Sequence, residues 1–437
     1  MKLRLDYGDS GLEVELPDHN LKQVLRLKAA AAIEPESINS AIVRALEAPI
    51  ECSPLSVQAA ECAAKGGNAC IVICDITRPV PNRLLLPPVL QTLEAAGINR
   101  DQITILIATG THRPNLGDEL VRLVGDEVAS GYRIVNHECR NDDSHVNLGY
   151  SPAGVPVRLD RTYVEASLRV TIGLIEPHFM AGYSGGRKLI MPGIASFETV
   201  SNWHCPKFLE SPFAQNGVVT GNPVHQEAHA IASMRPPGMI LDVTLNEANQ
   251  ITGIFAGELE SAWLKGVEFA SQHVCVDVDV PADIVVTTCA GLPLDATFYQ
   301  AVKGMVGALP AVKPRGTVII AAECSEGIGS PDFARALLET DDLETFVRYI
   351  SQPGVFVPEE WEVEELAKAV RHADVTCVTS GIDAATLSQC FVTPAESVEM
   401  AVESALAKHG ADATIIAIPR GPYVIPTRTA TPIQGAH

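Results

Sequence analysis

Two continuous apolar runs near the start of the chain each end in a cluster of polar residues. The first run, 69–74, leads into DITR (75–78), and the second, 103–108, leads into TGTHR (109–113). Runs of this length between turn residues predict strands buried on both faces, as in a parallel sheet. Segment 84–96 between them has apolar residues at helical spacing, so we expect a strand–helix–strand unit.

The polar residues after these two strands fall where ligands collect, outside the carboxyl ends of a parallel sheet. Asp75, Thr77 and Arg78 follow the first strand, and His112 and Arg113 follow the second. Each of these residues alone is more simply explained as solvated or structural. Two neighbouring strands that both end in such a cluster favour a binding site.

A glycine-rich segment further along predicts a site for a bulky anionic group. In EPHFMAGYSGGRKLIM (176–191), Gly185 and Gly186 let the backbone approach such a group and aim its N–H groups at it. Arg187 and Lys188 follow directly, so we expect their cationic ends to meet the same group. Burial or neighbouring cations would make Lys188 a nucleophilic amine suited to covalent attachment.

Two histidines distinguish this segment from an ordinary surface loop. His178 precedes the glycines and His204 follows the lysine, and each offers a proton carrier or a metal ligand. A glycine-rich turn followed by Arg-Lys is by itself common on protein surfaces. The histidines and the second polar cluster upstream favour a cofactor site.

The remaining pattern predicts an α/β protein of two domains with mainly parallel sheets and a cofactor and substrate cleft between them. We place an N-terminal cofactor-binding domain at 1–275 and a C-terminal domain at 280–400, and expect the segment 405–437 to return to the first domain. Hairpins are expected within 1–18 and 242–257. Further strands are predicted within 281–291, 317–324, 374–381 and 414–422, a helix is predicted at 294–308, and a loose tail is expected after Pro426.

Five motifs, taken in order, carry a resemblance to a known family. DITRP (75–79), ATGTHRP (108–114), EPHFMAGYSGGRK (176–188), NWH (202–204) and FYQAVKG (298–304) resemble the nickel-dependent lactate racemase family and its 2-hydroxyacid racemase and epimerase homologues. The resemblance runs from the N-terminus to IPRGPYVIP near the end of the chain. It implies an isomerase, and it leaves open which small 2-hydroxyacid is the substrate.

The resemblance also implies a cofactor and roles for individual residues. The family holds a nickel-pincer nucleotide, a pyridinium-3-thioamide-5-thiocarboxylic acid mononucleotide that grips nickel through two sulfur atoms and a ring carbon. Lys188 matches the lysine that tethers it covalently, His204 matches the protein's nickel ligand, and His112 and His178 match the catalytic acid–bases. The residues expected near the cofactor are Asp75, Thr77, Gly185, Gly186 and Arg187. Those expected around the substrate are Arg78, Tyr299, Gln300, Lys303 and Trp361, and we expect Thr111, Met180 and Tyr183 to tune substrate choice.

The chemistry of a 2-hydroxyacid explains why two histidines and a cofactor are needed. The hydrogen on Cα is very weakly acidic beside a carboxylate, so removing it as hydride and returning it to the other face is the easier route. The cofactor carries the hydride, and the protein supplies position and proton transfer. A base is needed beside the hydroxyl of each enantiomer, which predicts one histidine for each pose.

Composition narrows the partners and the compartment. The net charge of −21 argues against nucleic acid and anionic membranes, so an anionic substrate needs a local cationic pocket. The 11 cysteines lack CxxC spacing, and neither a signal peptide nor a long apolar span is evident, which favours a cytoplasmic protein with reduced thiols. The family resemblance implies a small 2-hydroxyacid substrate, and cofactor-biosynthesis and nickel-insertion proteins as partners.

Alternative interpretations stay open at this point. A non-catalytic binding protein for an anionic metabolite would need the same cationic pocket. His225 and His229 are spaced to bind zinc, but we interpret them as surface or capping residues because the glutamate is not placed as in HExxH. His137 and His145 flank an acidic, Asn-rich loop and are interpreted as solvated.

Overall fold

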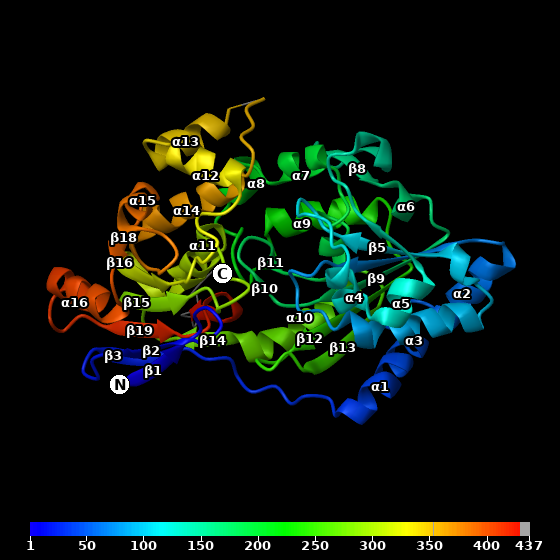
Figure 1. Cartoon of the computed structure of the whole chain (residues 1–437), viewed down its shortest axis with the longest axis horizontal. Coiled ribbons are helices and arrows are strands. Elements are labelled where there is room, and N and C mark those ends of the chain that lie inside the picture. The colour runs from blue at the N-terminus through cyan, green and yellow to red at the C-terminus, as the bar shows by residue number, and fades with distance from the viewer. Residues whose placement is uncertain (353, 429–437) are drawn as a thin grey trace, which may run out of the picture.

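The computed structural model describes residues 1–352 and 354–428, which form two lobes, each built around a six-stranded sheet (Figure 1). The strand order is β13-β12-β9-β4-β5-β6 in the first sheet and β18-β17-β16-β15-β19-β3 in the second. All neighbours pair in parallel except the β12–β13 hairpin. The predicted α/β class with mainly parallel sheets is confirmed.

The first sheet contains the two strands predicted from the apolar runs. β4 (Ala69–Cys74) pairs with β5 (Ile103–Ala108), and α3 (Asn82–Ala95) connects them, as expected for a strand–helix–strand unit. Both strands are buried along nearly their whole length, which explains their continuous apolar sequence. The other strands are β6 (Arg133–Asn136), β9 (Leu168–Leu174), β12 (Met239–Leu245) and β13 (Ile251–Gly257).

Helices and small hairpins surround the first sheet. The N-terminal helices α1 (Pro35–Glu47) and α2 (Leu55–Ala64) pack with α3 on one face. The remaining elements of this lobe are α4 (Asp118–Val124), α5 (Asp126–Gly131), β7 (His145–Tyr150), β8 (Pro156–Asp160), α6 (Arg161–Val164), β10 (Pro177–His178), β11 (Gly182–Tyr183), α7 (Phe197–Trp203), α8 (Pro206–Leu209), α9 (Pro223–Ser233) and α10 (Ser261–Val274).

The second sheet begins at the predicted strand near residue 280. Its strands are β15 (Ala282–Thr288), β16 (Val312–Ala321), β17 (Asp374–Val378), β18 (Thr393–Ala395), β19 (Ile415–Ile418) and β3 (Leu21–Val24). The helices of this lobe are α11 (Phe298–Ala308), α12 (Pro331–Leu338), α13 (Leu343–Ile350), α14 (Glu360–His372), α15 (Ala384–Gln389) and α16 (Val398–His409). α11 and α14 pack together on the side that faces the first lobe.

Both ends of the chain belong to the second lobe, whereas we expected them in the first. β19 lies inside the second sheet, between β15 and β3, and does not return to the first. The N-terminal hairpin of β1 (Lys2–Leu5) and β2 (Leu12–Glu15) shares a core with Ile284 and Ile415, so it belongs to the second lobe too. Alternating or apolar patterns reveal a strand but not its partner, which is why the sequence misplaced both segments.

The two lobes are joined near a short parallel pair. β14 (Cys275–Val278), which follows α10, pairs with β20 (Ile425–Arg428). Thr427 and Arg428 of the tail expected to be loose are therefore part of a strand, and 429–437 lies outside the described residues. All 11 cysteines are free thiols. Throughout 1–352 and 354–428, every helix is too short or too polar to cross a membrane.

Two histidine pairs are placed differently from their sequence interpretation. His137 is buried, with Nδ1 2.9 Å from Asp160 Oδ2 and Nε2 3.0 Å from the Ala195 carbonyl oxygen, and His145 is buried beside it. His225 is also buried and stacks on Trp263 at 4.9 Å between ring centroids. The expectation of a solvated position is therefore wrong for His137 and His145, and that of a surface position is wrong for His225. Polar neighbours in the sequence do not show whether a histidine ring points into the core or into solvent.

Candidate active site

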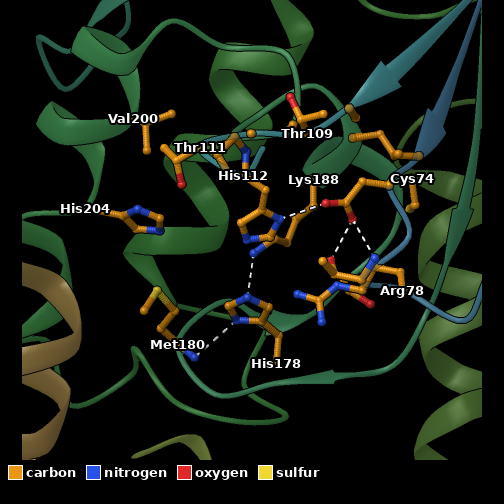
Figure 2. Close-up of a pocket in the computed structure, with 18 of the residues that line it drawn as sticks. Cys74, Arg78, Thr109, Thr111, His112, His178, Met180, Lys188, Val200 and His204 are labelled. Atoms are coloured by element: carbon orange, nitrogen blue, oxygen red, sulfur yellow. Dashed lines mark hydrogen bonds and ion pairs between the residues drawn. The ribbon is translucent and has the colours of Figure 1, made fainter. Parts of the chain in front are cut away.

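One cavity between the lobes collects most of the residues that the sequence singled out. It encloses about 1010 Å³ of empty space, part of it open to solvent. The predicted residues that line it are Asp75, Thr77, Arg78, Thr111, His112, His178, Met180, Gly185, Lys188, His204, Tyr299, Lys303 and Trp361. Figure 2 shows the three histidines and Lys188 around this space.

The fold explains how distant segments meet here. Asp75 and Arg78 follow β4 and His112 follows β5, so the parallel pairing brings both clusters to one sheet edge. The second lobe contributes Tyr299 and Lys303 from α11 and Trp361 from the start of α14. The cavity therefore forms only where the two lobes face each other.

His112 is oriented by an ionised carboxylate. Its Nδ1 lies 2.8 Å from Asp75 Oδ2, and the Thr77 hydroxyl donates to Asp75 Oδ1 at 2.6 Å. Burial disfavours ionisation of Asp75, but the hydrogen bond and charge of His112 and the Thr77 hydrogen bond hold its pKa below the ordinary value. The carboxylate accepts the Nδ1 proton, which leaves Nε2 of His112 as the proton-accepting atom.

His178 has the opposite arrangement. Its Nδ1 accepts hydrogen bonds from the backbone N–H groups of Met180 at 3.3 Å and Ala181 at 3.2 Å. A nitrogen that accepts these bonds carries no proton, so the proton is on Nε2. Burial lowers the pKa of His178 well below its usual range, and the neighbouring Lys188 and Arg78 lower it further. His178 is therefore a neutral ring with its N–H at Nε2.

Lys188 is held as an unprotonated amine. Its Nζ lies 2.6 Å from His178 Nε2, and because that nitrogen carries the proton, the amine must accept it. Burial lowers the pKa of Lys188 well below its usual range, and Arg187, Arg78 and Lys303 lower it further. A neutral buried amine has a free lone pair and is a nucleophile, which fits a covalent anchor.

His204 is the third histidine that lines the same space. It follows α7, its Nδ1 is buried without a hydrogen-bond partner, and its ring lies against Trp203 and Trp361. Burial lowers its pKa well below the usual range, which keeps the imidazole neutral and able to bind a metal. Among residues 1–352 and 354–428, no three His, Cys, Asp or Glu side chains are grouped so that they could hold a metal ion.

Two cations face the cavity from opposite lobes. Arg78 Nη1 lies 3.7 Å from Glu176 Oε1, and Lys303 donates to the Gln300 amide oxygen. Gln300 itself lies outside the cavity lining and acts on it through Lys303. Tyr299 accepts a hydrogen bond from Trp361 Nε1 at 2.9 Å, which leaves its own O–H available. A guanidinium and an ammonium across a small space suit a carboxylate.

The glycine-rich loop differs from its expected role in one respect. Gly185 lines the cavity, but the Gly186 N–H donates to buried Asp242 at 2.7 Å. Gly186 has φ +51°, and a Cβ there would lie 2.9 Å from the Trp263 ring. The loop therefore presses against the core, and Gly186 does not offer its N–H to the cavity.

Arg187 also points away from the cavity. Its Nη2 donates to the carbonyl oxygens of Ala181 and Tyr183, both at 2.9 Å, and its guanidinium lies 4.1 Å from the centroid of Trp263. Arg187 thus fixes the loop from behind. Tyr183 is likewise buried, with its hydroxyl near Cys275.

Several lining residues were not expected from the sequence. Glu362 follows Trp361 directly and is fully buried, and Phe179, Val200 and Cys74 complete parts of the wall. Glutamate in a helix is typically solvent-facing, so the adjacency to Trp361 was the available signal for Glu362.

A cavity between two lobes that joins two oppositely oriented histidines, a neutral lysine and a cationic pair has the residue types of an enzyme active site. The chain belongs to the lactate racemase family. The family model described as the lactate racemase N-terminal domain matches residues 7–217, and the lactate racemase C-terminal domain matches 278–425. The protein is accordingly an isomerase of the racemase class.

Two relatives and two solved structures are similar to this chain over nearly its whole length. A lactate racemase from Thermoanaerobacterium thermosaccharolyticum is 36% identical over 97% of this chain and 98% of its own length. A lactate racemase from Lactiplantibacillus plantarum is 33% identical over 96% of this chain and 98% of its own length. The apoprotein structure of the former superposes with a TM-score of 0.90 at 35% identity, covering 98% of this chain and 100% of that one. A structure of a Thermotoga maritima protein shares the fold, with a TM-score of 0.69 at 19% identity. The match covers 92% of this chain and 100% of that one.

Proposed function

We propose that this protein interconverts the enantiomers of a small 2-hydroxyacid of the lactate type with a nickel-pincer nucleotide tethered to Lys188. The observation that carries the proposal is the hydrogen bond of 2.6 Å between Lys188 Nζ and His178 Nε2. It holds a nucleophilic amine inside a cavity that also contains His112 and a cationic pair. The names of the curated relatives support lactate as the first substrate to test.

The residues present fit this cofactor. Lys188 would hold the nucleotide covalently, and the neutral imidazole of His204, on the cavity wall, would bind the nickel. When bound, the group supplies a hydride acceptor and donor for the substrate Cα. Asp75, Thr77 and Gly185 lie along the wall on the side of the first lobe, where they would flank the nucleotide.

Substrate binding is assigned to residues of both lobes. Arg78 and Lys303 would hold the carboxylate, and the free O–H of Tyr299 would add a hydrogen bond. Two charged partners and one neutral donor fix the orientation of a planar carboxylate while leaving Cα free. Because the anchors come from different lobes, binding would also hold the lobes together.

Proton transfer is assigned to the two histidines. For one enantiomer, His112 Nε2 would take the hydroxyl proton while Asp75 stabilises the resulting imidazolium. For the other enantiomer, His178 would serve as the base after the cofactor engages Lys188. The ring would first release its Nε2 proton to solvent and take one at Nδ1, so that the Nε2 lone pair faces the hydroxyl. A positioned base of this kind contributes roughly 10²–10⁴-fold in rate.

A comparison of loaded and unloaded protein tests the proposal. The chain should be produced with and without the cofactor-biosynthesis and nickel-insertion proteins that we expect as partners. We expect a mass increase on the peptide that contains Lys188, stoichiometric nickel and lactate racemisation only in the first case. Lys188→Ala should carry no covalent nucleotide in either case. A nucleotide still covalently bound in that variant would contradict the anchor assignment.

A non-catalytic binding protein for an anionic metabolite is the alternative. It would bind carboxylates through Arg78 and Lys303 and stay unloaded in a competent host. A cytoplasmic location also remains a prediction. Screening D-hydroxyacids for optical change with the loaded protein would decide which side chain at Cα the pocket accepts.

A further inference from the structure

The ammonium of Lys303 is a charge without an ion pair. The side chain lines the cavity from α11 and is partly buried there. Its hydrogen bond goes to the neutral amide oxygen of Gln300, one turn earlier on the same helix. A cation taken out of water without a counter-charge is costly, so other contacts have to offset that cost. The lysines that do form ion pairs within the described residues lie elsewhere: Lys265, Lys313, Lys368 and Lys408.

Two aromatic rings from opposite lobes provide such contacts. The ammonium nitrogen lies 5.5 Å from the ring centroid of Phe179, in the first lobe, and 5.8 Å from that of Tyr299, in the second. Both residues line the cavity. A cation over an aromatic face, within about 6 Å of the ring centroid, is attracted by the electrons of the ring. Lys303 therefore has both contacts only when the lobes face each other across the cavity.

Both rings are held in place by neighbours of their own. Phe179 is buried and stacks on His178, with 5.0 Å between the ring centroids and 18° between the ring planes. The Tyr299 hydroxyl accepts a hydrogen bond from Trp361 Nε1 at 2.9 Å, and the Tyr299 ring meets Phe333 edge to face at 5.0 Å. The ammonium thus lies near two fixed rings, one of which also contacts a histidine to which proton transfer is assigned.

The amide oxygen and the two rings are all neutral partners. They stabilise a positive charge, but none of them cancels it. A carboxylate of the protein at the same place would form an ion pair, and an arriving substrate would have to break that pair. With neutral partners the substrate meets an uncompensated charge and displaces no counter-ion. This environment therefore suits a cation that binds a carboxylate from solution.

Resting on the proposed function, which brings a substrate carboxylate to Lys303, we propose that Phe179 is a positioning residue that keeps this ammonium charged and unpaired, together with the ring of Tyr299. Phe179 acts through Lys303 and neither exchanges a proton nor forms a bond. Because Phe179 belongs to the first lobe and Lys303 to the second, the carboxylate anchor is complete only in the arrangement that also brings Lys303 and His178 to one cavity.

The charged groups around Lys303 decide how its protonation responds. Burial lowers the pKa of Lys303, Glu362 of α14 opposes this, and Arg78 across the cavity lowers it further. Cys289, which follows β15, and Glu176 of the first lobe raise the pKa to a smaller extent. Loss of an aromatic face would lower the pKa of Lys303 again, so the ammonium would lose its charge at a lower pH. Burial keeps two further basic groups near Lys303 neutral, His178 and Lys188.

A fluorine series at Phe179 measures the contribution of the ring face with little change in the shape of the ring. Phenylalanines with one, two and three fluorine atoms are incorporated at this position of the full-length, cofactor-loaded chain. Acetate binding is then measured by calorimetry from about pH 6 to about pH 10, where a lysine with a lowered pKa titrates. Fluorine withdraws electrons from the ring face and weakens its attraction for a cation. We expect acetate affinity at the lowest pH to change little, and its decline with rising pH to begin lower with each fluorine, by about half a unit or more for three.

Three further variants separate this role from a general effect of the ring. Three fluorine atoms on Phe298, which is buried at the start of α11 but lies outside the cavity lining, should leave the pH dependence unchanged. Lys303→Arg keeps a cation that stays charged over the whole range, so fluorination of Phe179 should then produce no shift. Phe179→Leu keeps an apolar side chain without a ring face, and it should move the decline in the same direction as fluorination.

The outcomes are distinguishable from a failure of the proposed function. The inference about Phe179 fails if fluorination leaves the decline in acetate affinity where it is in the wild type, or shifts it equally in Lys303→Arg. It also fails if affinity falls uniformly at every pH, which would indicate a merely structural role, or if acetate binds at no pH. Absence of lactate racemisation by the loaded wild type would instead overturn the proposed activity. Acetate has no hydroxyl and does not react, so its binding tests the role of Phe179 in either case.

Discussion

Asp75 and His112 form an oriented pair at the edge of the first sheet, with His112 Nδ1 2.8 Å from Asp75 Oδ2. The second oxygen of Asp75 is held by the Thr77 hydroxyl at 2.6 Å. One carboxylate thus fixes both the ring position and the tautomer of His112. The backbone N–H groups at His178 Nδ1 fix the other tautomer, so the two histidines are not equivalent in the empty cavity.

Replacing Asp75 with Asn should impair proton transfer more than substrate binding. The amide keeps the shape of the side chain but cannot stabilise a His112 imidazolium, so we expect kcat for lactate racemisation to fall roughly 10²–10⁴-fold with a smaller change in KM. Thr77→Val is the matched control, since it removes one hydrogen bond and keeps the carboxylate. Equal losses in both variants would show that loop geometry, and not the charge of Asp75, matters.

Replacing His204 with Ala should separate the metal from the organic cofactor. The protein would lose its own nickel ligand while Lys188 keeps the covalent attachment. We expect the mass increase on the Lys188 peptide to persist and nickel content to drop, as measured by mass spectrometry and metal analysis on the same sample. Asn202→Ala, on the outer side of α7, is the control and should leave both values unchanged. Unaltered nickel in His204→Ala would exclude this residue as the ligand.

The sequence predicted the parts of the site that lie at the ends of buried strands. Asp75 and His112 are far apart in the sequence but follow two neighbouring parallel strands. The two apolar runs were therefore enough to predict that these side chains lie close together. The residues of α11 were also predictable, because a helical spacing places Tyr299 and Lys303 on one face. The motifs then assigned roles that strand patterns cannot supply.

What the sequence could not predict depends on the direction of side chains and on long-range pairing. Arg187 stands between a glycine loop and Lys188, yet a buried Trp263 draws it to the opposite side. β19 has an apolar sequence that fits either sheet, and only tertiary packing selects its partners. Glu362 resembles a solvated helical residue until α14 is packed against α11.

The buried Glu364 should make the free energy of unfolding depend on pH, and replacing this one residue should remove that dependence. Burial raises the pKa of Glu364 from 4.5 to about 9, so the folded state keeps a proton that the unfolded state loses. The stability from this group is complete below pH 4.5 and is lost progressively up to pH 9, at up to about 1.4 kcal/mol per pH unit.

We therefore expect Glu364→Gln to gain stability relative to the wild type as the pH rises from 5 to 9. The buried amide adds a constant offset, but it does not titrate, so the difference in the free energy of unfolding should grow with pH. Urea unfolding at several pH values measures it. Glu403→Gln, at an exposed position of α16, is the control and should show no such slope. A difference independent of pH would mean that Glu364 is ionised in the folded protein.

The fate of the hydrogen on Cα tests the reaction route. If that hydrogen leaves as hydride and returns, deuterium placed at Cα of lactate should reappear at Cα of the opposite enantiomer in ordinary water. If His112 or His178 removed it as a proton, the label would be lost, because an imidazole N–H exchanges with solvent. We expect retention, because the hydrogen on Cα is very weakly acidic beside a carboxylate and the cofactor that Lys188 would hold supplies a hydride acceptor. Mass spectrometry of the separated enantiomers at low conversion measures the label, with unlabelled lactate in deuterated water as the reciprocal control. Rapid incorporation of solvent deuterium at Cα would overturn the hydride route and leave the family membership intact.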